Sequence, residues 1–337
     1  MAIGFTVHRG TGLRLSRLGF GGAPIGDLYR RLDDETAVAA VSAAIGAGVT
    51  LIDTSPLYGH GLSEARVGTA LRRAARDGLV LSTKVGRVLS PARGSADREG
   101  YAGGLPFTAR FDYGYDGALR SLDQSLLRLG TDRVEIALIH DVDVWTHGAA
   151  AIEAHFAEAM DGAYRALARL RSEGALKAIG VGVNESAMCA RFARSGDFDI
   201  MLMAGRYTLL EQESLDDFLP LAQQKGIAVL AGGVFNSGIL ATGSVADARY
   251  NYRPAPPAIR ERVERIDRVC RAHGVTQAVA AARFPLGHPA VASVVLGAVD
   301  PGEVARNVAA FETSIPAALW RDLATERLLR PDAPLPT

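Results

Sequence analysis

Residues 49–68 read VTLIDTSPLYGHGLSEARVG, an apolar run that leads through a turn into a helical pattern. The run at 49–53 is typical of a buried strand, and the segment from Glu64 onward is typical of a helix. The turn between them contains one proline and two glycines, which is ordinary for a connection. It is flanked by an acid, Asp53, and carries a phenol, Tyr58, and a simple connection needs neither.

The same alternation of apolar runs and helical patterns continues along the whole chain. Eight continuous apolar runs are predicted to be strands, and such runs are typical of a parallel sheet that is covered on both faces. The runs are LGFG (18–21), VTLID (49–53), LVLSTK (79–84), VEIALIH (134–140), AIGVGV (178–183), DIMLMA (199–204), IAVLAGG (227–233) and SVVLGA (293–298). Amphipathic patterns that predict helices lie between them, at 33–48, 115–130, 160–174, 185–196, 214–226 and 301–311.

Strands that are mostly followed by a helix predict a (β/α)8 TIM barrel, built as a single domain over residues 1–337. The segment FTVHRGTGLRLS (5–16) predicts a β-hairpin before the first barrel strand. A doubly wound sheet is the alternative, but the glycines of FGGAPIG (20–26) lack the G-x-G-x-x-G spacing of a dinucleotide-binding turn. Two segments, 86–114 and 141–158, exceed an ordinary connection. They predict long binding loops at the C-terminal face, with a mobile surface insertion as the alternative.

Composition narrows the classes of partner. Lys and Arg number 37 and Asp and Glu number 37, so the chain lacks the net positive charge that favours nucleic acid or an anionic membrane. No signal peptide or membrane-spanning run is predicted. Cys189 and Cys270 are predicted to be reduced thiols, which favours the cytoplasm, with a disulfide as the alternative. No metal site is predicted, and the expected state is a monomer or a small homo-oligomer.

Four polar residues are predicted to lie at the C-terminal ends of three successive strands. Asp53 ends the second strand, Tyr58 follows it, Lys84 ends the third and His140 ends the fourth. In a barrel these ends form one mouth, where active sites lie. A phenol titrates near a pKa of about 10, and a nearby ammonium lowers that value. Each residue alone has a structural explanation, but together they predict proton transfer to or from a substrate oxygen.

The motifs around these four residues resemble the aldo-keto reductase superfamily. DTSPLYG (53–59) matches the pattern D-T-[AS]-x-x-Y-G, and the lysine of STK (82–84) and the histidine that ends ALIH (137–140) also match. The resemblance extends from LGFGG (18–22) to LGAVDPGEVARN (296–307). It implies a catalytic tetrad of Asp53, Tyr58, Lys84 and His140, in which Tyr58 is the general acid in reduction and the general base in oxidation. It also implies a nicotinamide cofactor that is bound across the barrel mouth.

Within the superfamily, three segments are most similar to aldose 1-dehydrogenases of the L-fucose and D-threo-aldose type. They are IGVGVNE (179–185), AGRYTLLEQ (204–212) and GGVFNSGIL (232–240). Pyridoxal 4-dehydrogenase and L-galactose dehydrogenase are similar relatives. The resemblance implies oxidation of a cyclic hemiacetal to a lactone, with one hydride passed to the nicotinamide and one proton to the base. The expected partner is therefore a small sugar or a pyridoxal-like substrate.

The resemblance also suggests where the cofactor binds. Asn184 matches the asparagine that holds the nicotinamide carboxamide, whereas Ala204 replaces a glutamine that many members have. The other predicted cofactor contacts are Arg206, Tyr207, Phe235, Gly297 and Asn307. For Arg206, Tyr207 and Phe235, simple packing is the alternative.

Glu303 bears on the choice between NAD and NADP. It stands where NADP-preferring members carry an arginine that binds the 2′-phosphate. A carboxylate repels a phosphate and accepts hydrogen bonds from ribose hydroxyls, so the sequence predicts NAD. NADP is the alternative because Arg306 lies nearby, and Glu303 could also simply favour a helix N-terminus.

Aromatic residues near the mouth are candidates for substrate contacts, because aromatic faces stack on sugar rings and on pyridines. The candidates are Tyr29, Phe111, Trp145 and His147, with Tyr113 in the same long loop as Phe111. For each of them, packing within its loop is the alternative.

Other functions stay open at this point. An NADPH-dependent aldehyde or ketone reductase would use the same tetrad. A non-catalytic binding protein could share the fold, although it has no need of Lys84 and Tyr58 together. A phosphate-binding barrel with unrelated chemistry is a further alternative.

Overall fold

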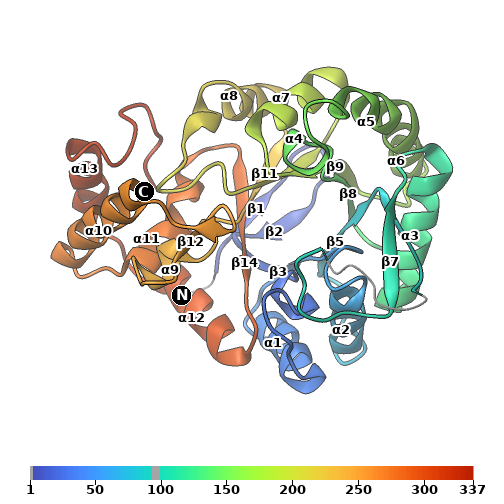
Figure 1. The fold of residues 1–337 in the computed structure, drawn as a ribbon, viewed down its shortest axis with the longest axis horizontal. Coiled ribbons are helices and arrows are strands. Elements are labelled where there is room, and N and C mark those ends of the chain that lie inside the picture. Colours follow the sequence, from blue (N-terminus) through green and yellow to red (C-terminus); the bar gives the residue numbers. More distant parts are fainter. Residues whose placement is uncertain (1–2, 93–98, 337) are drawn as a thin grey trace.

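The computed structural model describes residues 3–92 and 99–336 and contains a closed barrel of eight parallel strands (Figure 1). The strands are β3 (Leu18–Gly21), β4 (Leu51–Asp53), β5 (Val80–Val85), β8 (Ile136–His140), β9 (Ala178–Val183), β10 (Ile200–Ala204), β11 (Ala228–Gly232) and β14 (Val291–Gly297). The barrel closes where β14 pairs with β3. All eight strands predicted from the apolar runs take part, so the predicted (β/α)8 barrel is confirmed.

Helices surround the barrel. They are α1 (Asp34–Gly46), α2 (Leu62–Leu71), α3 (Tyr115–Leu129), α6 (Arg165–Ser172), α7 (Ser186–Ser195), α8 (Phe218–Lys225), α10 (Pro257–Ala272), α11 (Gln277–Arg283), α12 (Pro301–Glu312) and α13 (Ala317–Thr325). The helix predicted at 160–174 is more complex, because α5 (Ile152–Glu158) continues through a π-helical turn, η2 (Ala159–Tyr164), into α6. In the described part of the chain, no helix has the length and apolar character required to cross a membrane.

Alternation along the strands creates two separate apolar layers. Leu51, Val80 and Ile136 belong to an inner cluster within the barrel, whereas their neighbours Ile52 and Leu81 belong to the outer cluster beneath the helices. Successive residues of a strand face opposite sides of a sheet. Inward positions on β4, β5 and β8 therefore recur every second residue.

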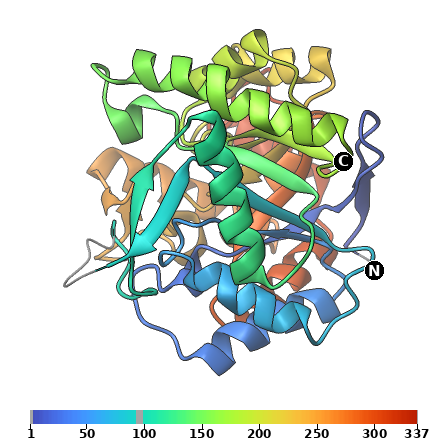
Figure 2. The ribbon, with the colours of Figure 1, turned by 90° about the vertical axis from the view of Figure 1, so that its right-hand side faces the viewer.

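The predicted N-terminal hairpin is present as β1 (Phe5–Val7) and β2 (Arg14–Ser16). It leads directly into β3, so it lies at the end of the barrel where the strands begin. Leu13 and Leu15 of the hairpin join the inner cluster and close that end. Figure 2 shows the hairpin on one side of the barrel and the ribbon that contains β7 on the other.

The two long segments at the C-terminal face are more ordered than the sequence predicts. Residues 86–114, predicted as a loop, contain the antiparallel ribbon of β6 (Arg87–Pro91) and β7 (Phe107–Phe111), although 93–98 lie outside the described residues. The segment 141–158 contains α4 (Val144–His147) and ends in α5. Apolar periodicity in these segments is too short to predict such elements.

A further excursion, which the sequence analysis missed, follows β11. It contains α9 (Ile239–Thr242) and the two-residue strands β12 (Arg249–Tyr250) and β13 (Arg253–Pro254). Tyr252 lies at the turn between these strands and reaches the barrel mouth.

Candidate active site

Asp53, Lys84 and His140 share the inward face of their strands with the inner apolar cluster. Asp53 lies two residues beyond Leu51, Lys84 four beyond Val80 and His140 four beyond Ile136. The even spacing turns all three side chains into the barrel at the ends of the strands. The structure thus brings together three residues that are widely separated in sequence, and Tyr58 joins them from the loop after β4.

Lys84 and Asp53 form a buried ion pair. Nζ of Lys84 donates to Oδ2 of Asp53 at 2.7 Å and to the carbonyl oxygen of Thr54 at 2.8 Å. Oδ1 of Asp53 accepts from the hydroxyl of Ser82 at 2.8 Å. The two residues are only 1% and 2% exposed, so each charge depends on the other and on these hydrogen bonds.

Tyr58 lies between the ion pair and His140. Its ring centre is 4.8 Å from Nζ of Lys84 and 6.0 Å from the ring centre of His140. Burial raises the pKa of the Tyr58 phenol well above its usual value, and the carboxylates of Asp53 and Asp141 raise it further. The net shift is upward because burial and the two carboxylates outweigh the lowering that a nearby ammonium is expected to give.

The loop that carries Tyr58 needs its glycines. Gly59 and Gly61 have φ of 62° and 93°, values that residues other than glycine rarely adopt. A Cβ atom on Gly59 would lie 2.3 Å from the carbonyl oxygen of Gly26. The close approach of these two backbones places Tyr58 at the mouth, and α2 begins at Leu62, two residues before the predicted start at Glu64.

His140 is buried beside a cation that the sequence analysis missed. Its Nδ1 lies 3.1 Å from Nη1 of Arg87 and 3.1 Å from the hydroxyl of Ser55, and its Nε2 lies 3.5 Å from Oδ2 of Asp141. Burial lowers the pKa of His140 well below its usual value, and the charges of Arg87 and Lys84 lower it further. The imidazole is therefore neutral around neutral pH, as the sequence predicts for an orienting group.

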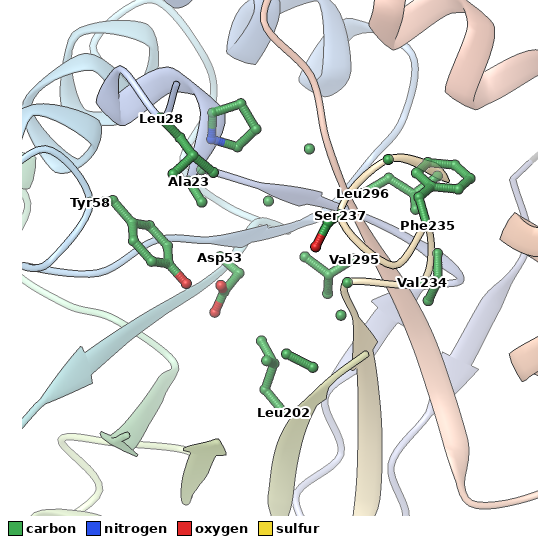
Figure 3. Close-up of a pocket in the computed structure, with 18 of the residues that line it drawn as sticks. Ala23, Leu28, Asp53, Tyr58, Leu202, Val234, Phe235, Ser237, Val295 and Leu296 are labelled. Atoms are coloured by element: carbon green, nitrogen blue, oxygen red, sulfur yellow. The ribbon is translucent and has the colours of Figure 1, made fainter. Parts of the chain in front are cut away.

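Two cavities meet at Tyr58. The first, of about 340 Å³, is mostly apolar and extends toward β11 and β14 (Figure 3). The second, of about 520 Å³, has Lys84, His140 and Asp141 in its lining, and we call it the polar cavity. In Figure 3 the hydroxyl of Tyr58 and the carboxylate of Asp53 turn toward the same space. The volumes of the two cavities are those of ordinary small-molecule sites.

The first cavity suits a flat ring system. Its lining includes six glycines, which leave room for close approach: Gly21, Gly22, Gly232, Gly233, Gly238 and Gly297. Beyond Gly297, the side chain of Asp300 accepts from the backbone nitrogen of Glu303 and caps the N-terminus of α12. An apolar, glycine-lined cleft that leads to a helix N-terminus fits a nicotinamide dinucleotide.

The predicted cofactor residues divide between the two cavities and their edge. Phe235 and Gly297 line the first cavity and Asn184 lines the second. Arg206 donates to the carbonyl oxygen of Asn184 at 2.7 Å and lines a small recess beside it. Tyr207 does not fit the prediction: it is 1% exposed and its ring packs on Phe284 and His288, away from the linings described.

The adenosine-end candidates lie around the start of α12. Oε2 of Glu303 accepts from the backbone nitrogen of Val299 at 3.0 Å, and Nη2 of Arg306 lies 3.8 Å from Oε1 of Glu303. Nδ2 of Asn307 donates to the carbonyl oxygen of Gly297 at 3.2 Å. Glu303 thus fixes the turn after β14 and also presents charge there.

The predicted substrate residues separate into two groups. Tyr29 and Trp145 are 55% and 47% exposed and line the second cavity. Phe111 and His147 instead pack against one another, 4.5 Å apart between ring centres, and Nε2 of His147 lies 2.9 Å from the Tyr113 hydroxyl. These two are absent from the described cavity linings, so the prediction of substrate contact is wrong for them and the packing alternative holds.

Other residues of the mouth were not predicted from the sequence, including Arg87, Tyr101, Asp141 and Tyr252. Asp141 immediately follows His140, so its position beside the strand end was available as a signal. Its backbone has φ of 54°, an unusual conformation for a residue without glycine's freedom. Nothing in local sequence marks Arg87 or Tyr252, because both reach the mouth by long-range packing.

Comparison with known proteins agrees with the fold and shows the family. The sequence model of the Aldo/keto reductase family matches residues 17–325, so the chain belongs to this family of oxidoreductases, which use NAD(P)H. It is 39% identical to pyridoxal 4-dehydrogenase of Microbacterium luteolum, over 95% of this chain and 96% of the relative. It is 38% identical to D-threo-aldose 1-dehydrogenase of a Pseudomonas species, over 94% and 96%.

A solved structure supports the fold alone. The glycerol dehydrogenase of Gluconobacter oxydans superimposes with a TM-score of 0.76, over 100% of this chain and 98% of that chain, at 23% identity.

Proposed function

We propose that this protein oxidises the ring carbon of a cyclic hemiacetal to a lactone, with NAD(P) as the hydride acceptor and Tyr58 as the general base. One observation carries the proposal: Tyr58 lies where the apolar and the polar cavity meet, beside a buried Lys84–Asp53 pair and a neutral His140. The names of two relatives support the substrate class, because an aldose and pyridoxal both form cyclic hemiacetals.

The residues of the mouth have different roles in the proposed reaction. The bound nicotinamide supplies a hydride acceptor. The C–H bond of the hemiacetal carbon breaks with its electron pair leaving as hydride, and the O–H proton passes to the Tyr58 phenolate, so a lactone forms. His140 lies in the polar cavity, where its neutral ring can hold the reacting oxygen.

Oxidation and reduction require different protonation states of Tyr58. Because the pKa of Tyr58 is raised, the phenol holds its proton around neutral pH. Oxidation therefore depends on the small fraction of phenolate, whereas reduction uses the dominant phenol. Lys84 and Asp53 keep a fixed pair of charges beside the ring in both directions.

We propose NAD as the preferred cofactor, with NADP as the alternative. The carboxylate of Glu303 is held at the turn after β14 by the Val299 nitrogen, next to the N-terminus of α12. A fixed negative charge there disfavours a 2′-phosphate. Arg306, 3.8 Å from Glu303, is the group that would support NADP.

The wider setting is also part of the proposal. We propose that residues 1–337 form one barrel domain that acts in the cytoplasm as a monomer or small homo-oligomer. Cys189 and Cys270 are both free and buried, in line with a reducing compartment.

The test is the initial rate of nicotinamide reduction with NAD and NADP in parallel. The substrates are L-fucose, D-arabinose, L-galactose and pyridoxal, and Tyr58→Phe serves as the control for background oxidation. Turnover of a sugar supports an aldose dehydrogenase, and turnover of pyridoxal alone supports a pyridoxal 4-dehydrogenase. No oxidation at all, together with NADPH-dependent reduction of simple aldehydes, would overturn the proposal in favour of a reductase.

A further inference from the structure

Arg87 is a buried cation that contacts the candidate catalytic histidine. It is 5% exposed, and its Nη1 lies 3.1 Å from Nδ1 of His140 and 2.9 Å from Oδ2 of Asp141. The guanidinium carbon lies 4.5 Å from the centre of the Phe111 ring. A carboxylate and an aromatic face thus fix the cation against one particular nitrogen of the imidazole.

We propose that Arg87 is a positioning residue that holds His140 as the tautomer with its hydrogen on Nε2. A guanidinium has five N–H donors and no acceptor, so a hydrogen bond between Nη1 and Nδ1 requires a lone pair on Nδ1. The single ring hydrogen of neutral His140 then lies on Nε2. This inference rests on the proposed function only through the role of His140 toward the substrate.

Oδ2 of Asp141 lies 3.5 Å from Nε2 and favours the same tautomer, because a carboxylate accepts a hydrogen bond. Ser55 and Tyr113 do not determine the tautomer. The hydroxyl of Ser55 also lies 3.1 Å from Nδ1, but a hydroxyl can donate or accept. The hydroxyl of Tyr113 donates to the His140 carbonyl oxygen rather than to the ring. Arg87 is therefore the neighbour of Nδ1 that can only donate.

The charges around His140 act in the same direction. Arg87 from β6 and Lys84 from β5 both oppose a positive imidazolium, while Asp141 is paired with Arg87. Tyr58 faces the ring from the loop after β4, and its phenol is neutral around neutral pH. His147, beyond Tyr113, has a pKa lowered to about 4 by burial and by His155, so it adds no charge near neutral pH.

The backbone holds Arg87 in place from both sides. Gly86 has φ of 105°, and a Cβ atom there would lie 2.4 Å from the Tyr113 ring. The carbonyl oxygen of Arg87 accepts from the hydroxyl of Ser121 on α3 at 2.8 Å. The chain thus turns sharply after β5 and is tied to α3, so the guanidinium is directed under the mouth rather than into solvent.

The consequence is a fixed donor at the polar cavity. With Nδ1 engaged by Arg87, Nε2–H is the ring group left to donate to an oxygen of the substrate. The opposite tautomer would present a lone pair on Nε2, which can only accept the hydroxyl hydrogen that Tyr58 must receive. Arg87 thus controls the hydrogen-bonding character of His140 and does not touch the substrate itself.

The tautomer can be measured without any substrate. The wild-type protein, labelled with ¹⁵N at its seven histidines, is compared by long-range ¹H–¹⁵N NMR with Arg87→Met and Arg87→Lys. His140→Gln identifies the His140 signals. We expect Nε2–H in the wild type and no protonation through about pH 6.5, where free histidine titrates. Arg87→Met should increase the Nδ1–H population and raise the pKa of His140 above its wild-type value, although burial and Lys84 continue to lower it. Arg87→Lys should restore the wild-type signals.

Kinetics supply the second readout. Arg87→Met should lower turnover roughly tenfold or more around neutral pH, within the range that a positioned acid–base group contributes. The deficit should shrink at lower pH, because an imidazolium again carries a hydrogen on Nε2. Arg87→Lys should recover most of the loss.

Arg76→Met is the matched control. Arg76 pairs with Glu135 next to the start of β8, at the opposite end of the barrel, so this variant should lose stability with no new pH dependence. A wild-type His140 with Nδ1–H would overturn the proposal, even if Arg87→Met failed to fold. A change in stability alone in Arg87→Met, with unchanged NMR signals and pH profile, would also overturn it. Failure of the hemiacetal panel leaves the NMR result intact, so the two proposals fail separately.

Discussion

Nζ of Lys84 lies 2.7 Å from Oδ2 of Asp53, with both side chains withdrawn from solvent inside the barrel mouth. Each member of the pair has a further hydrogen bond, since Lys84 also donates to the Thr54 carbonyl and Asp53 also accepts from Ser82. A buried charge with such partners is tolerated, whereas the same charge without its partner is very costly. The Lys84–Asp53 pair therefore affects both the stability of the fold and the proposed reaction.

Lys84→Met should lower the free energy of unfolding by about 3–5 kcal/mol, because Asp53 is left as an unpaired buried carboxylate. The double variant Asp53→Asn, Lys84→Met should recover most of this stability but no turnover. Urea denaturation measures the first effect and initial rates the second. A double variant as unstable as the single one would contradict the account of the pair.

The pH dependence of the two directions should differ because the pKa of Tyr58 is raised by burial and by the nearby carboxylates. A raised pKa keeps the phenol protonated, so the phenolate needed for oxidation grows about tenfold per pH unit and does not level off below about pH 10. Reduction, which uses the phenol, should stay flat over that range. Steady-state kcat/KM against pH in both directions provides the measurement. A plateau for oxidation around neutral pH would argue against Tyr58 as the titrating base.

The architecture and the central residues of the site could be predicted from sequence for a local reason. A strand buried on both faces is a short continuous apolar run, and the barrel repeats this signal eight times. Asp53, Lys84 and His140 interrupt such runs at their ends, where a polar side chain has no packing purpose. Because alternate residues of a strand face the same side of the sheet, all three side chains point into the barrel mouth.

The rest of the site depends on contacts between segments that are distant in sequence. Arg87 and His140 are 53 residues apart, and nothing around Arg87 distinguishes a buried arginine from an exposed one. In the sequence, Phe111 and Trp145 are both aromatic residues of long loops. In the structure, Phe111 lies on β7 and packs against His147, whereas Trp145 lies at the mouth. Periodicity carries no information about where such long segments pack.

Trp145→Ala and Phe111→Ala should therefore have different effects. Trp145 is exposed at the polar cavity, so its loss should raise KM for the substrate and leave the unfolding free energy nearly unchanged. Phe111 packs against Tyr113, His147 and the Arg87 guanidinium, so its loss should lower stability by about 3 kcal/mol. Kinetics and urea denaturation of both variants test this separation. An unchanged KM in Trp145→Ala would remove Trp145 from the substrate contacts.

Glu303→Arg should shift the ratio of kcat/KM for NADP over NAD upward by about tenfold or more, because it replaces a charge that repels the 2′-phosphate with one that attracts it. Glu303→Gln is the control, since an amide oxygen can still accept from the Val299 nitrogen. It should produce a smaller shift in the same direction. If both variants keep the wild-type cofactor ratio, Glu303 serves only to fix the turn after β14.

Gly59→Ala should damage the protein more than Gly226→Ala, although both residues have positive φ, 62° and 71°. A Cβ atom at Gly226 meets nothing within 4 Å, so only the left-handed backbone opposes it, at about 1–2 kcal/mol. At Gly59 the same atom would lie 2.3 Å from the Gly26 carbonyl oxygen, and relieving that overlap adds about 1–3 kcal/mol. The relief must also move the adjacent Tyr58, so kcat should fall in Gly59→Ala and stay unchanged in Gly226→Ala. Equal losses of stability, or a normal kcat in Gly59→Ala, would show that the loop can shift away from Gly26 without disturbing Tyr58.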